Sequence, residues 1–220
     1  MLDTLQNGIG YAVVCDGMGG ASGGKVASLN AVNTFTSLIV DLTPDMTEQQ
    51  ILHTFETAVR KSNFEIYNKS LNNPELMGMG TTLVGAVVIG NKAYIINIGD
   101  SRCYLLHDDV FKRITKDHSA VQELVDQGLL NEAQARNHPN KNIITRALGV
   151  DYDVEYDVFI QDVGKDDYLL LCTDGITNYI DDLEIPFEII KNPETAPNRL
   201  IELSNSRGGA DNSTVVIIKM

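Results

Sequence analysis

Three aspartates in this chain lie beside short apolar stretches, where their carboxylates could act together on a cation. Asp16 and Asp174 each follow an apolar run and precede a glycine, and Asp211 leads into a third apolar run. Short apolar runs bounded by turn residues are typical of strands that are covered on both faces. Because magnesium, manganese and calcium prefer oxygen ligands, three carboxylates at strand ends would suit a hard divalent cation.

The same pattern has a simpler interpretation. Asp and Gly are both favoured in tight turns, and an isolated Asp-Gly pair is more often a turn than part of a ligand set. Three such aspartates beside apolar runs strengthen the case for a metal site without excluding three turns. The residues alone therefore leave both interpretations open.

Length and composition limit what the chain can be. Its 220 residues, 43% of them hydrophobic, are enough to bury one sizeable core and predict a single domain. The formal net charge of −13 repels the phosphate backbone of nucleic acids, so we expect no nucleic-acid partner. The same acidic character can attract divalent cations.

The cysteines and the length of the apolar runs bear on the compartment. Cys15, Cys103 and Cys172 lie inside apolar runs without a paired spacing, so they are expected to be small core residues in a reducing environment. The sequence shows no signal-peptide pattern and no apolar run of the roughly 18 residues that a membrane-spanning helix needs. We therefore expect a cytoplasmic protein with no membrane partner.

Two amphipathic helices are predicted in the first third of the chain. Residues 24–40 place apolar side chains along one helical face. A second helix is expected to begin at Thr47, whose hydroxyl can cap it while the Gln50 side chain reaches back, and to end at residues 72–74.

Strands dominate the rest of the chain. A period of two predicts one hairpin over residues 81–98 and another over residues 101–114, and four neighbouring strands with short turns predict an antiparallel sheet. A polar helical stretch is predicted at residues 119–137, and strands are predicted at residues 154–160 and 168–172. A helix with proline in its first turn begins at about Pro197, and a last strand covers residues 213–219.

Six short motifs occur in order along the chain. They are D-G-M-G-G at residues 16–20, M-G-T-T at 79–82, G-D-S-R at 99–102, K-D-H-S at 116–119, T-D-G at 173–175 and A-D-N-S-T at 210–214. In this order they resemble the motifs of the metal-dependent protein serine/threonine phosphatases of type 2C, the PPM type, in their bacterial form. The longer stretch H-P-N-K-N-I-I-T-R-A-L-G at residues 138–149 resembles the same family. One motif alone is weak evidence, whereas six in order cover nearly the whole chain.

The resemblance implies a fold and a reaction. The fold is of the α+β class, a four-layer αββα sandwich in which two antiparallel sheets pack face to face with helices outside both. Residues 1–220 would form a single domain, with residues 118–149 as a flap-like excursion within it. The implied reaction is hydrolysis of phosphoserine and phosphothreonine in proteins by a water that bridges two divalent ions, Mn²⁺ or Mg²⁺, which lower its pKa.

Metal ligands follow from the same resemblance. Asp16 would bridge both ions, the Gly17 carbonyl would bind the first, and Asp174 and Asp211 would hold the second. Asp117 would bind a third, weaker ion together with Asp174, although an aspartate at this place could instead cap the next helix. The expected catalytic residues are therefore Asp16, Asp174 and Asp211, and the sequence identifies no substrate-binding residue.

Four residues near the motifs are expected to have lesser roles. Asp100 and Arg102 are expected to form a structural hydrogen-bonded pair. His118 and His138 are expected to be loop residues, although either could donate a proton.

Two departures from the family pattern stand out. Many members carry, after the first Asp-Gly, a histidine that can protonate the leaving oxygen, and this chain has Met18 there. Members also carry a phosphate-gripping arginine and an acidic pair before the first motif, whereas the fifteen residues before Asp16 contain no arginine and only Asp3 as an acid. We therefore expect the N-terminal edge strand with its arginine to be missing, and phosphate binding to be weaker unless another residue such as Arg146 provides it.

These departures leave two alternatives to an active protein phosphatase. One is a catalytically impaired relative that acts as a binding or regulatory module, and the other is an unrelated metal phosphohydrolase of small molecules. Retention of Asp16, Asp174 and Asp211 favours catalysis, because a binding module does not need all three. The expected partners are phosphorylated proteins, the products of a serine/threonine kinase, and the expected oligomeric state is a monomer.

Overall fold

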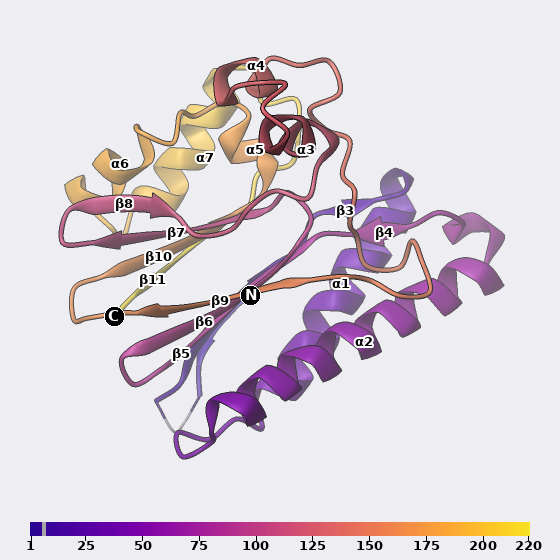
Figure 1. Ribbon diagram of the computed structural model, residues 1–220, viewed down its shortest axis with the longest axis horizontal. Helices are drawn as coiled ribbons and strands as arrows, with labels where there is room; N and C mark the ends of the chain where they lie inside the picture. Colours follow the sequence, from indigo (N-terminus) through magenta and orange to yellow (C-terminus); the bar gives the residue numbers. More distant parts are fainter. Residues whose placement is uncertain (6–7) are drawn as a thin grey trace.

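The computed structural model describes residues 1–5 and 8–220 and consists of two antiparallel sheets packed face to face (Figure 1). Across the first sheet the strands follow the order β1 (Leu2–Thr4), β2 (Gly10–Val14), β5 (Leu83–Ile89), β6 (Lys92–Ile98) and β9 (Asp157–Asp162). Across the second sheet they follow the order β11 (Val215–Lys219), β10 (Tyr168–Cys172), β7 (Arg102–His107) and β8 (Val110–Arg113). Two short strands, β3 (Gly17–Met18) and β4 (Gly80–Thr81), pair with each other outside both sheets.

Helices lie outside both sheets (Figure 1). The first sheet is covered by α1 (Gly20–Ile39) and α2 (Glu48–Asn72), and the second by α5 (Asp174–Thr177), α6 (Ile185–Lys191) and α7 (Ala196–Ser206). The helices α3 (Ala120–Asp126) and α4 (Glu132–Arg136) lie beyond one end of the sandwich, and a 3-10 turn, η1 (Pro74–Leu76), follows α2. This is the four-layer αββα sandwich that the resemblance implied.

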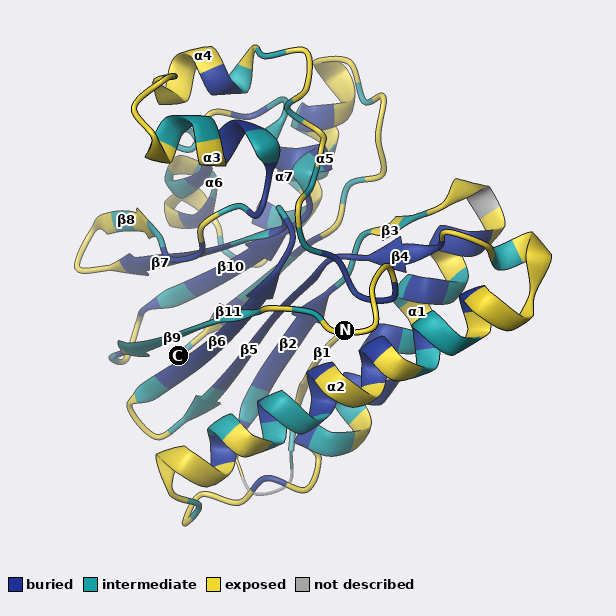
Figure 2. Ribbon diagram, turned by 45° about the vertical axis from the view of Figure 1, so that its right-hand side comes forward, coloured by how far each residue is buried: buried dark blue, intermediate teal, exposed yellow. Residues whose placement is uncertain are grey.

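Three apolar cores hold the four layers together. One lies between the first sheet and its two helices and contains Phe35 and Phe55, whose ring centroids are 5.7 Å apart. A second core lies between the sheets, and a third lies between the second sheet and its helices. The middle strands are therefore buried on both faces (Figure 2), which explains why they read as nearly continuous apolar runs in the sequence.

The ends of α2 confirm the sequence prediction. The Thr47 hydroxyl accepts a hydrogen bond from the Gln50 amide, and the Gln50 side chain accepts one from the Thr47 amide, which completes the capping box. The helix ends at Asn72, directly before the Asn73-Pro74 pair.

The first helix begins earlier than predicted, at Gly20 instead of residue 24. The residue before it, Gly19, has a φ of 106°, a conformation that favours glycine. A Cβ added to Gly17 would lie 1.9 Å from the carbonyl oxygen of Gly24 in α1. Because both residues lack a side chain, the helix packs directly on the backbone that follows Asp16.

The two predicted hairpins form, but they belong to different sheets instead of one. Strands β5 and β6 lie in the first sheet, and β7 and β8 lie in the second. The chain crosses over at Gly99, which has a φ of 99° and on which a Cβ would lie 2.6 Å from the Thr82 Cγ2 atom. A residue with a side chain could make neither this turn nor this contact without strain, so the glycine allows the change of sheet.

Some elements differ from the prediction at their ends. The strand predicted at residues 154–160 is β9, which starts three residues later, and the short helices α5 and α6 were not predicted. Strand β1 was also not predicted; it pairs with β2 at the edge of the first sheet and carries no arginine. The expectation that the N-terminal edge strand is missing is therefore wrong, because residues 2–4 form one, although it carries no arginine.

The cysteines and helices bear on the compartment only in part. Cys103 and Cys172 are buried and Cys15 is half-buried, and all three are free thiols, in agreement with their prediction as core residues. In the described part of the chain, no helix is both long enough and apolar enough to span a membrane.

Candidate metal centre

Asp16 is positioned by the M-G-T-T motif. The chain leaves β2 at Val14, and the carbonyl oxygen of Asp16 accepts hydrogen bonds from the Thr81 hydroxyl and the Thr82 amide, both at 2.9 Å. In return the Asp16 amide donates to the Thr82 hydroxyl at 2.9 Å. Thr81 of β4 and Thr82 directly after it thus fix the backbone of Asp16, which explains why the motif needs both threonines.

The G-D-S-R motif joins the same network. The Ser101 hydroxyl lies 2.8 Å from the Thr82 hydroxyl. Asp100, directly before Ser101, therefore lies in a turn that is tied to the backbone of Asp16 through Thr82.

Asp174 lies at the start of α5, two residues after the end of β10. One turn later on the same helix, the Asn178 side chain donates a hydrogen bond of 2.9 Å to the Asp174 Oδ2 atom. This contact holds one carboxylate oxygen in place and leaves the other for a second partner.

The loop of Asp211 packs on α5. Thr173 binds this loop twice, because its hydroxyl donates to the Asn212 carbonyl at 3.3 Å and accepts from the Thr214 amide at 3.0 Å. A Cβ on Gly175 would lie 2.2 Å from the Asn212 carbonyl oxygen. The glycine of the T-D-G motif therefore allows the loop of Asp211 to approach the helix of Asp174.

Burial and mutual repulsion act on these carboxylates. Burial, with the nearby charges of Asp174 and Asp211, raises the pKa of Asp16 to about 7. Burial and the charge of Asp211 also raise the pKa of Asp174. Such repulsion between carboxylates is relieved by a proton or by a cation.

Asp100 is a member of this group that sequence reasoning missed. Burial, then the charges of Asp174, Asp117 and Asp16, raise the pKa of Asp100 to about 8. The available signal was an aspartate two residues after the strand at residues 92–98, but it was interpreted as the partner of Arg102. The structure shows no such pair, because Arg102 binds Asp117 instead.

Asp16, Asp100, Asp174 and Asp211, called the acid group from here on, predict an unusual dependence of folding stability on pH. A carboxyl whose pKa is raised on folding binds more protons in the folded state, so its contribution is complete below the unfolded value of about 4 and is lost as pH rises through the folded value. For Asp16 and Asp100 these folded values are about 7 and about 8. In chelator-treated protein we therefore expect the melting temperature to fall between pH 5 and pH 8.5, less steeply in Asp16→Asn. A melting temperature that is flat or rises across this interval would contradict the electrostatic description.

The donor set fits a hard divalent cation. Asp16, Asp174, Asp211 and Asp100 supply carboxylate oxygens, which such cations prefer, and their mutual repulsion is what a cation would offset. Within residues 1–5 and 8–220, no three acidic, histidine or cysteine side chains form a compact chelating group. The fit to a metal therefore rests on the chemistry and charge of the donors and not on a compact arrangement of them. The Gly17 carbonyl, the remaining predicted ligand, lies against α1. Its oxygen is 2.4 Å from the position that an added Cβ on Gly24 would take.

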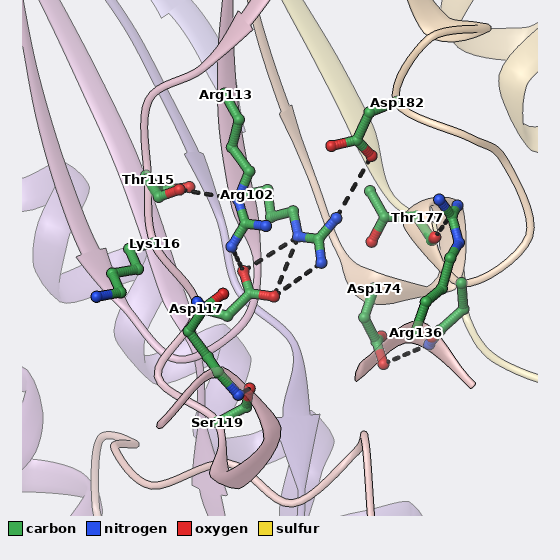
Figure 3. Close-up of polar contacts among 12 residues, drawn as sticks. Arg102, Arg113, Thr115, Lys116, Asp117, Ser119, Arg136, Asp174, Thr177 and Asp182 are labelled. Atoms are coloured by element: carbon green, nitrogen blue, oxygen red, sulfur yellow. Dashed lines mark hydrogen bonds and ion pairs between the residues drawn. The ribbon is translucent and has the colours of Figure 1, made fainter. Parts of the chain in front are cut away.

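Asp117 is held by two arginines (Figure 3). Arg102 binds both of its carboxylate oxygens, at 2.8 to 3.2 Å, and the Arg113 Nη2 atom lies 2.6 Å from its Oδ1 atom. Arg102 also contacts Tyr104 and Asp182. The Asp117 side chain is only 11% exposed. It does not cap α3, because the Ser119 hydroxyl performs that role.

The excursion over residues 118–149 closes on the helix of Asp174. Arg136 at the end of α4 donates to the carbonyl oxygens of Thr177 and Ile180 and to the Asp181 carboxylate, as Figure 3 shows for Thr177. A cavity of about 520 Å³ lies between the excursion and α5, and Asp100, Asp117, Asp174, Arg113, Arg136 and Lys141 are among its lining residues. Asp100 and Asp174, but not Asp16 or Asp211, thus line a cavity that also carries cationic side chains.

The remaining predicted residues lie elsewhere. Arg146 is paired with Glu155 at 2.9 Å and Asp157 at 3.1 Å, and it lines a second cavity together with Met18. His138 accepts a hydrogen bond from the Asn140 amide in a local turn of the excursion. Neither residue lines the cavity that Asp174 lines.

Comparison with known protein families gives a match over most of the chain. The model of the family described as protein phosphatase 2C matches residues 2–196. The serine/threonine phosphatase stp of Listeria innocua is 40% identical over 210 residues, which are 94% of this chain and 83% of that protein. The serine/threonine protein phosphatase PstP of Mycobacterium tuberculosis is 37% identical over 217 residues, which are 98% of this chain and 41% of that protein.

Solved structures agree with the sequence matches. The serine/threonine phosphatase Stp1 from Staphylococcus aureus superposes with a TM-score of 0.92 and 34% identity, over 100% of this chain and 87% of that one. The catalytic domain of PstP, solved in complex with two manganese ions, gives a TM-score of 0.82 and 36% identity over 94% of this chain and 86% of that one.

Proposed function

The chain belongs to the protein phosphatase 2C family and is a protein serine/threonine phosphatase, and from this premise we propose that its acid group hydrolyses phosphoserine and phosphothreonine with the help of two divalent cations, Mn²⁺ or Mg²⁺. The observation that carries the proposal is that burial, together with the nearby charges of Asp174 and Asp211, raises the pKa of Asp16 to about 7. The two manganese ions of the PstP structure support the choice of metal.

The roles proposed for the residues follow their positions. Asp16 is near enough to both Asp174 and Asp211 for their charges to raise its pKa, which would suit it to hold both cations. The Gly17 carbonyl would help to hold the first cation, and the other two aspartates would hold the second. Asn178 orients Asp174, and Thr173 keeps the loop of Asp211 against α5. When bound, the cations would lower the pKa of a water molecule, so that hydroxide would be available to attack phosphorus.

Asp117 is proposed as the ligand of a third, weaker ion that it shares with Asp174. Both residues line the same cavity, which supports the assignment. Because two guanidinium groups already bind the Asp117 carboxylate, a cation there would compete with them, and competition of this kind supports weak binding.

The proposed substrates are phosphorylated proteins, and the proposed source of the phosphate is a serine/threonine kinase. The cavity beside Asp174 carries the cationic side chains of Arg113, Arg136 and Lys141, which suit an anionic phosphoester. We also propose a cytoplasmic monomer in which residues 1–220 form one domain and residues 118–149 its flap-like excursion. The relatives compared above are named as enzymes, and nothing in the structure favours the regulatory alternative.

Chelation provides the test of the proposed chemistry. Hydrolysis of a phosphothreonine peptide should require added Mn²⁺ or Mg²⁺ and should stop in excess chelator, whereas a small phosphoester such as p-nitrophenyl phosphate should be turned over less efficiently. Equal rates with and without chelator would refute metal dependence. Turnover of small phosphoesters without any turnover of phosphopeptides would instead indicate the small-molecule phosphohydrolase.

A further inference from the structure

The buried side chain of His118 links the turn of Asp100 to the excursion. It is 7% exposed. Its Nδ1 atom accepts a hydrogen bond of 3.1 Å from the Gly99 amide, and its own amide donates one of 3.0 Å to the Gly99 carbonyl. One residue thus binds both polar groups of the glycine at which the chain crosses between the sheets.

The contacts of the two ring nitrogens of His118 determine which of them carries the proton. Because Nδ1 accepts an amide hydrogen, it must present a lone pair, and the proton belongs on Nε2. The Nε2 atom lies 3.2 Å from the Asp157 Oδ2 atom and donates to it. The Arg146 Nη1 atom lies 3.1 Å from Nε2, but with the proton on Nε2 it donates to the Asp157 Oδ1 atom instead, also at 3.1 Å. Both ring nitrogens are therefore occupied, which leaves His118 no proton for a leaving group.

These contacts bear on two of the acids. Asp100 lies between Gly99, which His118 holds, and Ser101, which Thr82 holds. Asp117 directly precedes His118 in the chain. The His118 carbonyl oxygen also accepts a hydrogen bond of 2.8 Å from the Thr145 amide, so the same residue ties the return of the excursion to this turn.

We propose that His118 is a positioning residue for the phosphatase reaction, whose Nδ1 lone pair fixes the Gly99 peptide and thereby the directions in which Asp100 and Asp117 face Asp16 and Asp174. The inference rests on the proposed function. His118 touches neither substrate nor cation in this role. Its effect passes through the backbone of residues 99–101 and of Asp117.

Two isosteric substitutions separate the two sides of the ring. In His118→Asn the amide oxygen takes the place of Nδ1, so the contact with Gly99 survives and the contact with Asp157 is lost. In His118→Gln the amide reaches the place of Nε2, so the contact with Gly99 is lost. Since groups that orient metal ligands typically contribute about ten- to a hundredfold, kcat should fall by about that factor in His118→Gln and by less than about threefold in His118→Asn. KM for the phosphopeptide should be nearly unchanged in both.

Two further readouts do not depend on turnover. Calorimetric titration with Mn²⁺ should show weaker binding in His118→Gln than in His118→Asn. Hydrogen exchange of the segment around Gly99 should accelerate only in His118→Gln, and this measurement stands even if the wild-type protein shows no phosphatase activity. His53→Asn, on an exposed position of α2, controls for the loss of a histidine and should match the wild type in all measurements.

The outcomes decide the proposal in either direction. Retained kcat and retained protection of the Gly99 segment in His118→Asn support it, also when His118→Gln fails to fold. An equal loss of kcat and of melting temperature in both variants would show that His118 only stabilises the fold, and retention in His118→Gln with loss in His118→Asn would show that the contact with Asp157 matters instead. Either result overturns the assignment.

Discussion

Replacing Asp174 by asparagine is expected to lower the rate of phosphopeptide hydrolysis at least about a hundredfold. Loss of a group that merely orients a metal ligand typically costs about ten- to a hundredfold, and Asp174 is itself a proposed ligand whose charge the cations require. The substitution keeps the shape of the side chain, and Asn178 can still donate to its oxygen. The measurement is kcat at saturating Mn²⁺, with calorimetric titration of Mn²⁺ beside it.

Two comparisons make this result specific. Asp166→Asn is the same chemical change at a position that is 70% exposed, where the carboxylate pairs only with Lys219 among the described residues, and it should leave kcat unchanged. Asp117→Ala should lower turnover while the two tighter ions remain bound, because Asp117 is proposed for the weaker third ion only. If Asp174→Asn retains wild-type turnover and Mn²⁺ affinity, the proposed ligand set is wrong.

The second large effect is expected from Gly175→Ala. The new Cβ would lie 2.2 Å from the Asn212 carbonyl oxygen and 3.0 Å from the Ser213 hydroxyl. The loop must move away by roughly an ångström to reach ordinary contact, which breaks the hydrogen bond that the Ser213 hydroxyl donates to the Gly175 carbonyl. Overpacking of this kind typically costs about 1–3 kcal/mol of folding free energy.

Activity should suffer more than stability in Gly175→Ala, because the displaced loop carries Asp211. We expect kcat at limiting Mn²⁺ to fall by at least about tenfold, with partial recovery at high Mn²⁺, and a lower melting temperature. Gly164→Ala is the matched control, since its Cβ would meet only the Asp167 Oδ2 atom, at 3.8 Å. Wild-type Mn²⁺ dependence in Gly175→Ala would show that the close approach does not position Asp211.

The strand ends that carry two of the candidate ligands could be predicted from the sequence because their signals are local. Asp16 and Asp174 follow apolar runs that the structure forms as β2 and β10, and a strand end can be recognised from a few neighbouring residues. The capping box at Thr47 was predictable for the same reason. The order of the motifs then identified the fold, including the helices outside both sheets.

Features that depend on tertiary contacts could not be predicted in the same way. Asp100 gains its raised pKa from burial and from acids that lie far away in the sequence. The pairing of Asp117 with Arg102 and Arg113 depends on the register of β7 and β8, in which Tyr104 lies opposite Arg113. The assignment of the two hairpins to different sheets depends on one glycine turn, which periodicity does not reveal.

The order of strands has a consequence for how fast the site can form. Strand β7 lies beside β10, more than sixty residues later in the chain, and β2 lies beside β5, about seventy residues later. Contacts between such distant segments stabilise the chain only after long loops have closed, which costs conformational entropy. Proteins rich in such contacts fold in milliseconds to seconds. Because the acids come from residues 16, 100, 174 and 211, metal binding should appear only with the last cooperative phase of refolding, and no partly folded intermediate should hydrolyse phosphoesters.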